Sequence, residues 1–195
     1  MRSGRALALA VASVVLLAGC TSGDPLAQQY ESGTDQGWIS GDGSTVELPP
    51  DARTEPVVFA GVDENGDPIS SDDYLGDVYV VNFWWAACPP CRVEAPDLVS
   101  LAAEYADVPF LGVNTQDGPG QAKAFAAEFG VEYPSILDAD DAAVQLAFAG
   151  SGMPPNAVPS TLVLDREGRV AARISGLVRD PSILSAMIDR VLEDG

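Results

Sequence analysis

The segment WWAACPPC, residues 84–91, places Cys88 and Cys91 two residues apart, with two prolines between them. Such a pair can form a reversible disulfide, supply half of a metal site, or act as a permanent cross-link. A structural zinc ion takes four Cys or His ligands, whereas the chain has three cysteines and no histidine. A permanent cross-link across so short a loop would restrict the unfolded chain little. The spacing therefore favours a redox-active pair.

The residues on either side of the pair predict where the two thiols lie. The apolar run VYVVNFWW, residues 78–85, predicts a strand buried on both faces. The apolar spacing over residues 91–105 predicts a helix. Cys88 would then lie at the N-terminus of that helix, where free N–H groups and the helix dipole favour a thiolate. We expect Cys88 to attack a substrate disulfide and Cys91, the more buried thiol, to resolve the mixed disulfide.

The elements that position this pair follow from the pattern of the remaining chain. Asn65 and Gly66, between two extended stretches, predict a β-hairpin. Periodicity predicts strands over 108–114, 160–165 and 169–176, and helices over 120–130, 140–150 and 180–192. Strands that alternate with helices, followed by a strand pair and a closing helix, indicate an α/β domain. We expect a mostly parallel sheet with a late antiparallel hairpin.

Composition excludes several classes of function. The formal net charge is −19, which argues against a nucleic-acid partner, because phosphate binding needs clustered Lys and Arg. The absence of histidine removes Cys-His and Ser-His nucleophile pairs and every histidine metal site. No dinucleotide-binding glycine motif is present in the sequence, so the protein is not expected to draw electrons directly from NADPH.

The first 54 residues predict export and tethering. Residues 1–20 combine two arginines, a short apolar run and small residues before Cys20, which resembles a bacterial lipoprotein signal with Cys20 as the lipidated residue. The alternatives are an ordinary secretory cleavage site and a retained anchor. Residues 21–54 are rich in Ser, Gly, Asp and Pro and predict a flexible linker. We therefore expect an extracytoplasmic domain that contacts the cell membrane through its lipid anchor.

The residues around the cysteines resemble the TlpA/ResA-like branch of membrane-anchored thioredoxin-fold proteins. The resemblance rests on Val81-Asn82-Phe83-Trp84, Cys88-Pro89-Pro90-Cys91-Arg92, Glu94, Pro96, Val158-Pro159-Ser160-Thr161 and a preceding hairpin with Gly66. It covers residues 55–195. It implies a thioredoxin fold, in which helices flank a central mixed sheet, with an N-terminal β-hairpin extension and a helical insertion.

The resemblance also implies roles for individual residues. Cys88 matches the attacking cysteine and Cys91 the resolving one. Pro159 matches a proline that is cis in thioredoxin folds and lies against the pair. Val158 would offer its backbone groups to an extended substrate segment. Glu94 matches a glutamate that influences the cysteine pKa values or relays protons, although a solvated charge on the helix surface is the alternative.

The surface that faces the substrate departs from the family pattern. The family usually has Trp directly before the first cysteine, whereas this chain has Ala87 there and Trp85 two residues earlier. We assign Trp85, Pro89 and Pro90 to this surface. The departure bears on which partner the protein recognises.

The resemblance implies a thiol–disulfide oxidoreductase with no cofactor beyond the Cys88–Cys91 disulfide and no metal. It would reduce disulfides of exported proteins, such as apocytochrome c, with electrons from a membrane protein of the DsbD/CcdA type. One alternative is an oxidase. A peroxidase of the peroxiredoxin type is disfavoured, because Trp85 stands where its nucleophile has a threonine. The alternative outside enzymes is a metal-binding or chaperone module.

Overall fold

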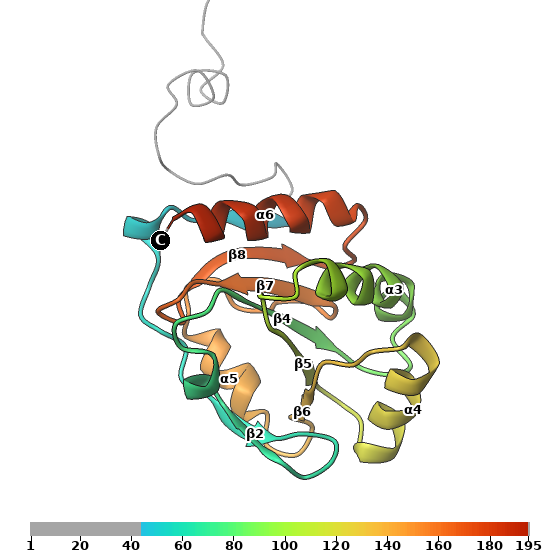
Figure 1. Cartoon of the computed structure of the whole chain (residues 1–195). Helices are drawn as coiled ribbons and strands as arrows, with labels where there is room; N and C mark the ends of the chain where they lie inside the picture. The colour runs from blue at the N-terminus through green and yellow to red at the C-terminus, as the bar shows by residue number, and fades with distance from the viewer. Residues whose placement is uncertain (1–43, 195) are drawn as a thin grey trace, which may run out of the picture. The chain divides into compact units, whose positions relative to one another are not determined.

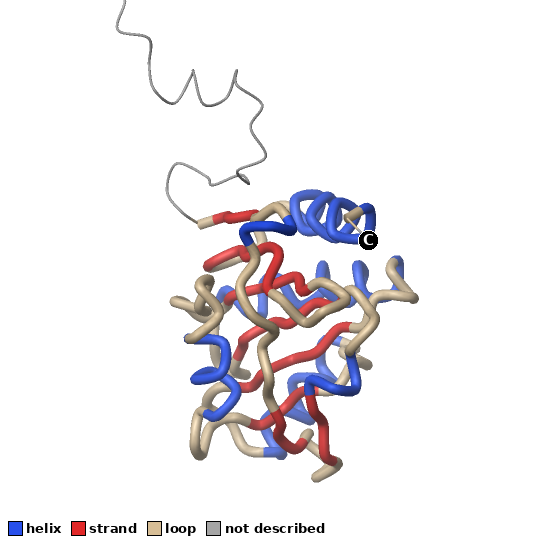
Figure 2. The backbone as a smooth tube through the Cα atoms, turned by 90° about the vertical axis from the view of Figure 1, so that its left-hand side faces the viewer, coloured by secondary structure: helices blue, strands red, loops and turns tan. Residues whose placement is uncertain are grey.

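The computed structural model describes residues 44–194, and its centre is a six-stranded sheet with helices on both faces (Figures 1 and 2). The strands lie in the order β1 (Thr45–Glu47), β8 (Val170–Ser175), β7 (Ser160–Leu164), β4 (Tyr79–Trp84), β5 (Phe110–Asn114) and β6 (Ser135–Leu137). The helices are α3 (Pro89–Glu104), α4 (Pro119–Phe129), α5 (Ala143–Ala149) and α6 (Pro181–Glu193). This is the expected thioredoxin-type α/β layout. No helix within residues 44–194 is long and apolar enough to cross a membrane.

The sheet is mixed, and the expectation of a mostly parallel sheet is wrong. β4 pairs in parallel with β5, and β5 with β6. The other three pairings, β4 with β7, β7 with β8 and β1 with β8, are antiparallel. β7 lies on the side of β4 away from β5 and runs antiparallel to it, so the chain direction reverses between β6 and β7. A linear pattern of strands and helices does not encode this reversal.

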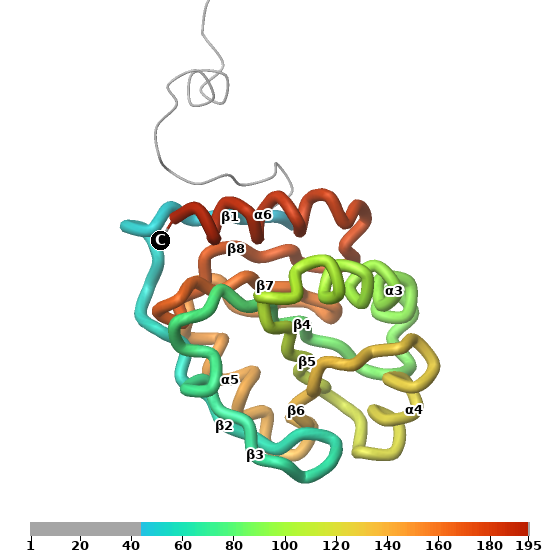
Figure 3. Tube along the Cα trace, in the orientation of Figure 1, coloured from blue at the N-terminus to red at the C-terminus, as the bar shows by residue number. Residues whose placement is uncertain are grey.

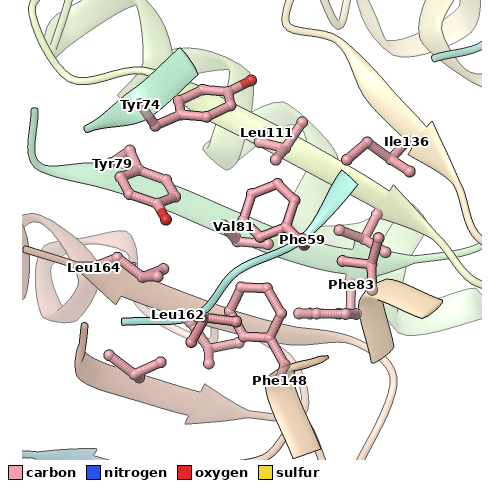
Figure 4. Close-up of a cluster of buried hydrophobic side chains, with 14 of the residues drawn as sticks. Phe59, Tyr74, Tyr79, Val81, Phe83, Leu111, Ile136, Phe148, Leu162 and Leu164 are labelled. Atoms are coloured by element: carbon pink, nitrogen blue, oxygen red, sulfur yellow. The ribbon is translucent and has the colours of Figure 1, made fainter. Parts of the chain in front are cut away.

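The side chains of β4 contribute to hydrophobic cores on both faces of the sheet. Every residue of β4 is buried, and successive side chains point to opposite faces. Tyr79, Val81 and Phe83 contribute to one core, which also holds Phe59 and Phe148 (Figure 4). The alternate positions, 80, 82 and 84, face α3 and α4 on the other side. Asn82 and Trp84 therefore lie on the same face of the sheet as the cysteines.

A hairpin closes one edge of the main sheet. β2 (Ala60–Val62) and β3 (Pro68–Ser70) pair antiparallel around the expected turn, and η2 (Ser71–Tyr74) follows them. Asp63 forms an isolated antiparallel bridge with Ile136 of β6. The predicted N-terminal hairpin is thus confirmed, and it covers an edge that would otherwise expose unpaired backbone groups.

The folded domain begins before residue 55, so the C-terminal part of the predicted linker is wrong. β1 pairs with β8 (Figure 3), Val46 and Leu48 pack against the core, and η1 (Pro50–Ala52) follows. A strand of three residues is too short to show a period, and the surrounding Gly, Pro and Asp masked it. The predicted signal segment and Cys20 lie outside the described residues.

Candidate active site

Cys88 and Cys91 lie where the chain passes from β4 into α3. They form a disulfide with an S–S distance of 2.02 Å and a Cα–Cα distance of 5.3 Å. Cys88 is the N-cap residue of α3, and its Sγ accepts a hydrogen bond of 3.2 Å from the Cys91 N–H. Pro89 and Pro90 fill the first two helical positions, where a missing N–H removes no intrahelical bond. As expected, Cys88 Sγ lies at the end of the helix that stabilises a thiolate.

Both cysteines are buried in this disulfide form. Cys88 is 1% exposed and Cys91 is 2% exposed. The expectation that Cys91 is the more buried of the two is therefore wrong for the oxidised protein. The reason is that both cysteines belong to one packed cluster, which also contains Trp84, Ala95, Ala122 and Phe125.

The residues assigned to the substrate-facing surface lie around this cluster. Trp85 is half-buried and packs against the cluster. Pro89 is exposed and Pro90 is half-buried, so both border the surface beside Cys88. Ala87, in place of the usual Trp, is exposed and adds little apolar area of its own.

The segment before β7 presents free backbone groups beside the cysteines. The Val158–Pro159 peptide bond is cis, as the resemblance implies. Val158 is half-buried and packs against the cluster that contains both cysteines. Among residues 44–194 nothing hydrogen-bonds to the N–H or the C=O of Val158. An extended peptide laid alongside could use both groups.

Glu94 is buried, and the alternative of a solvated surface charge is wrong. It is 1% exposed, because α3 turns it inward toward β4. Asn82 Nδ2 donates to its Oε1 at 3.0 Å, and the Val178 N–H donates to its Oε2 at 2.9 Å. Asn82 Nδ2 also donates to Thr161 Oγ1 at 3.0 Å. A polar network thus joins α3, β4, β7 and the loop after β8.

Burial changes the acid–base behaviour of Glu94. Loss of water around the carboxylate raises the pKa of Glu94 to about 7, against the opposing effect of the two hydrogen bonds from Val178 and Asn82. The negative charge of Asp97 raises it further. A carboxyl with this pKa can both take up and release a proton near neutral pH.

Asn82 of this network also lines a small pocket beside Cys91. Its volume is about 10 Å³, which is about the space that one water molecule needs. Asn82, Trp84 and Cys91 line it together with Ala95, Leu98, Phe125, Val131 and Tyr133. Asn82 therefore contacts Glu94 on one side and borders the Cys91 pocket on the other.

Two further polar residues of the site were not predicted from the sequence. Asp117 accepts a hydrogen bond of 2.5 Å from the Ala86 N–H, and Thr161 accepts from Asn82. A signal for Asp117 exists, because it follows β5, the parallel neighbour of β4. The carboxyl ends of neighbouring parallel strands meet at one edge of a sheet. Thr161 belongs to the motif at residues 158–161 that carries the family resemblance, but its contact with Asn82 was not predicted, because that contact depends on the antiparallel pairing of β7 with β4.

Comparison with known proteins agrees with this geometry. The chain is 35% identical over 117 residues to the thiol:disulfide interchange protein HelX of Rhodobacter capsulatus, covering 60% of this chain and 62% of HelX. It is 30% identical over 113 residues to the thiol-disulfide oxidoreductase ResA of Geobacillus thermodenitrificans, covering 57% and 62%. The chain thus spans less than two thirds of the length of these relatives.

Solved structures show the same fold. A DsbF homologue from Corynebacterium diphtheriae superposes with a TM-score of 0.67 at 29% identity, covering 81% of this chain and 99% of that one. The model of the AhpC/TSA family matches residues 50–173, which include both cysteines, Glu94 and the cis-proline. The chain therefore belongs to the AhpC/TSA family, and its relatives include thiol–disulfide oxidoreductases of the ResA type.

Proposed function

We propose that this protein is an extracytoplasmic thiol–disulfide oxidoreductase that reduces disulfides of exported proteins. The observation that carries the proposal is the Cys88–Cys91 disulfide at the start of α3, beside the free backbone groups of Val158. A nucleophile at a helix N-terminus and a docking edge next to it are the two parts that the reaction needs. The names of the relatives support the same chemistry.

The proposed reaction has two exchange steps. The Cys88 thiolate attacks one sulfur of the substrate disulfide, and the other substrate sulfur leaves as a thiolate and takes up a proton. Cys91 then loses its proton and attacks Cys88 Sγ, which releases the second substrate thiol. The substrate gains two electrons and two protons, and the protein is left with the Cys88–Cys91 disulfide. The protein uses no cofactor other than this disulfide.

Glu94 fits the role of proton acceptor for Cys91 in the second step. Its carboxyl is coupled through Asn82 to the pocket that Cys91 lines. Its pKa of about 7 lies near the working pH, where a general base is most effective. Asn82 cannot take a proton, so in this proposal it orients the carboxylate.

The location and partners are part of the proposal. Lipidation at Cys20 would tether the domain to the outer face of the cell membrane. A membrane protein of the DsbD/CcdA type would return the pair to its dithiol form, and the disulfide of an apocytochrome c is the substrate that the family resemblance implies. The dithiol form, and not the disulfide described above, is the form that acts on a substrate.

A trapping experiment with matched variants tests the proposal. Cys91→Ser leaves the attacking thiol but removes the resolving one, so mixed disulfides with exported proteins should accumulate and disappear on reduction. Cys88→Ser, the matched control, should trap none. If neither variant traps a partner and the wild-type pair does not react with oxidised glutathione, the proposed activity is contradicted.

A further inference from the structure

The three residues before the nucleophile, residues 85–87, form a loop that another part of the chain holds; we call them the pre-cysteine loop. The Ala86 N–H donates to Asp117 Oδ2 at 2.5 Å, and the Ala86 carbonyl accepts from Arg92 Nη1 at 3.2 Å. The Cys88 N–H donates to the Trp85 carbonyl at 3.1 Å. Because Ala86 lies between these two hydrogen-bonded residues, a displacement of Ala86 also displaces Cys88.

Asn114 holds the Asp117 carboxylate independently of the contact between Asp117 and the pre-cysteine loop. Asn114 Nδ2 donates to the same Oδ2 of Asp117 at 2.9 Å. In return, Asn114 Oδ1 accepts from the Asp117 N–H at 2.7 Å and from the Gln116 N–H at 3.2 Å. Asn114 is itself fully buried at the end of β5. The acceptor for Ala86 is thus anchored to the central sheet.

The second contact leads to the same part of the chain. Arg92, which holds the Ala86 carbonyl, also pairs with Glu128 of α4. Its guanidinium lies 4.9 Å from the centre of the Phe129 ring. Trp84 directly precedes the pre-cysteine loop, and its carbonyl accepts a hydrogen bond of 3.0 Å from the Thr115 N–H. Residues 114–129 therefore hold the backbone before Cys88 directly at the Trp84 carbonyl and the Ala86 N–H, and indirectly, through Arg92, at the Ala86 carbonyl.

We propose that Asp117 is a positioning residue for the nucleophile. Its acceptor oxygen, and not its charge, holds the pre-cysteine loop so that Cys88 Sγ meets the substrate disulfide in line. This inference rests on the proposed function. Displacement of a reacting group by about 1 Å can reduce a rate by up to about a hundredfold. Loss of the hydrogen bond between Asp117 and Ala86 should therefore lower the reaction rate measurably.

Two substitutions at position 117 separate the hydrogen bond from the charge. In Asp117→Asn the amide oxygen can replace Oδ2 as the acceptor for both donors. The amide nitrogen then takes the place of Oδ1, which accepts no hydrogen bond from the described residues. Asp117→Ala removes the acceptor altogether. A matched control is Asp63→Ala, because Asp63 Oδ1 accepts the N–H groups of Asn65 and Asp67 in the distant hairpin.

The measurement is the second-order rate constant for the reaction of the reduced full-length chain with oxidised glutathione, followed from pH 5 to 9. We expect Asp117→Ala to lower the plateau rate by about tenfold. Asp117→Asn and Asp63→Ala should stay within about threefold of wild type, with an unchanged pH midpoint. An unchanged rate in Asp117→Ala, an equal loss in both position-117 variants, or an equal loss in Asp63→Ala would each overturn the inference.

A second measurement does not depend on activity. Amide hydrogen exchange should show the Ala86 N–H protected in the wild type and in Asp117→Asn, and exposed in Asp117→Ala. If the wild type does not react with glutathione while Ala86 is protected in this pattern, the proposed function fails and the structural contact stands. An Ala86 amide that exchanges equally fast in all three proteins would remove the basis of the inference, even if Asp117→Ala folds poorly.

Discussion

Glu94 is the residue whose properties depend most on its surroundings. A glutamate on a helix normally faces water and keeps its charge, whereas Glu94 lies between α3 and β4 with two hydrogen bonds. The sequence did not decide between these environments, because the helical pattern of α3 is only weakly amphipathic around it. The contact that decides it, with Asn82, joins residues on two different elements. The burial of the Glu94 carboxyl therefore could not be predicted without the three-dimensional fold.

The burial of Glu94 predicts a pH dependence of stability. In the unfolded chain the carboxyl has its ordinary pKa of 4.5, and in the folded state the pKa is raised to about 7. Between these values the folded state binds more protons, so the free energy of unfolding falls as pH rises. The fall from this group is about 3 kcal/mol, complete above pH 7 and absent below pH 4.5.

The variant Glu94→Gln isolates this contribution. Gln cannot ionise, so the difference in unfolding free energy between wild type and variant should change by about 3 kcal/mol from pH 4.5 to 8. Urea denaturation of the oxidised proteins across this range measures it. Curves that stay parallel over the whole range would show that Glu94 is not ionised differently in the two states.

At the level of elements, β5 and β6 shape the space behind the cysteines. Trp84 lies across β5, where its Nε1 donates to Ser135 Oγ of β6 at 3.3 Å. Its ring packs on Phe125 of α4, with 4.3 Å between centroids. The crossing is possible because residue 112 has no side chain. A Cβ at Gly112 would lie 2.1 Å from Ser135 Oγ and 2.7 Å from Trp84 Nε1.

We therefore predict opposite effects for two Gly→Ala substitutions. Gly112→Ala forces Trp84 or Ser135 to move and should destabilise the domain by about 1–3 kcal/mol. Gly120→Ala, in the first turn of α4, meets nothing within 4 Å and should stabilise by about 0.5–1 kcal/mol. Thermal or urea unfolding of both variants makes the comparison. Equal effects of the two substitutions would contradict the packing described for Trp84.

The long elements and the β2–β3 hairpin were predictable from the sequence, whereas the short strand β1 was not. The strand at 79–84 is a continuous apolar run, the helix at 181–193 is strongly amphipathic, and prolines mark where this helix and the one at 89–104 begin. β1 has three residues and no pattern. The order of the sheet depends on the antiparallel placement of β7 beside β4, which the linear pattern of strands and helices does not encode. The redox role of the Cys88–Cys91 pair could be predicted without the fold, because the spacing of the two cysteines indicates it.

At the scale of the domain, residues 44–54 form ion pairs with its C-terminal part. Arg53 has a buried side chain, which pairs with Asp165 at 3.1 Å and also with Asp194. Glu47 of β1 pairs with Arg190 of α6. Residues 44–54 are therefore part of the fold, although their composition suggests a linker.

This predicts where the domain can be truncated. A chain that starts at Ser44 should keep the unfolding free energy of one that starts at Thr21. A chain that starts at Glu55 loses β1 and leaves Asp165 with Arg169 as its remaining ion partner, so it should lose roughly 3 kcal/mol. Urea unfolding of the three chains, each with its disulfide formed, tests the boundary. Equal stability of the Ser44 and Glu55 chains would place residues 44–54 outside the cooperative fold.

The most direct test of the account is the reduction potential of the Cys88–Cys91 pair. The chain with Cys20→Ser is equilibrated in graded dithiothreitol or glutathione buffers, and its free thiols are counted by alkylation. A reductant supplied by a membrane donor should have a potential at or below about −250 mV, close to that of thioredoxin. A potential near about −120 mV would make the protein an oxidant, and failure to form any reversible bond between Cys88 and Cys91 would contradict the redox assignment itself.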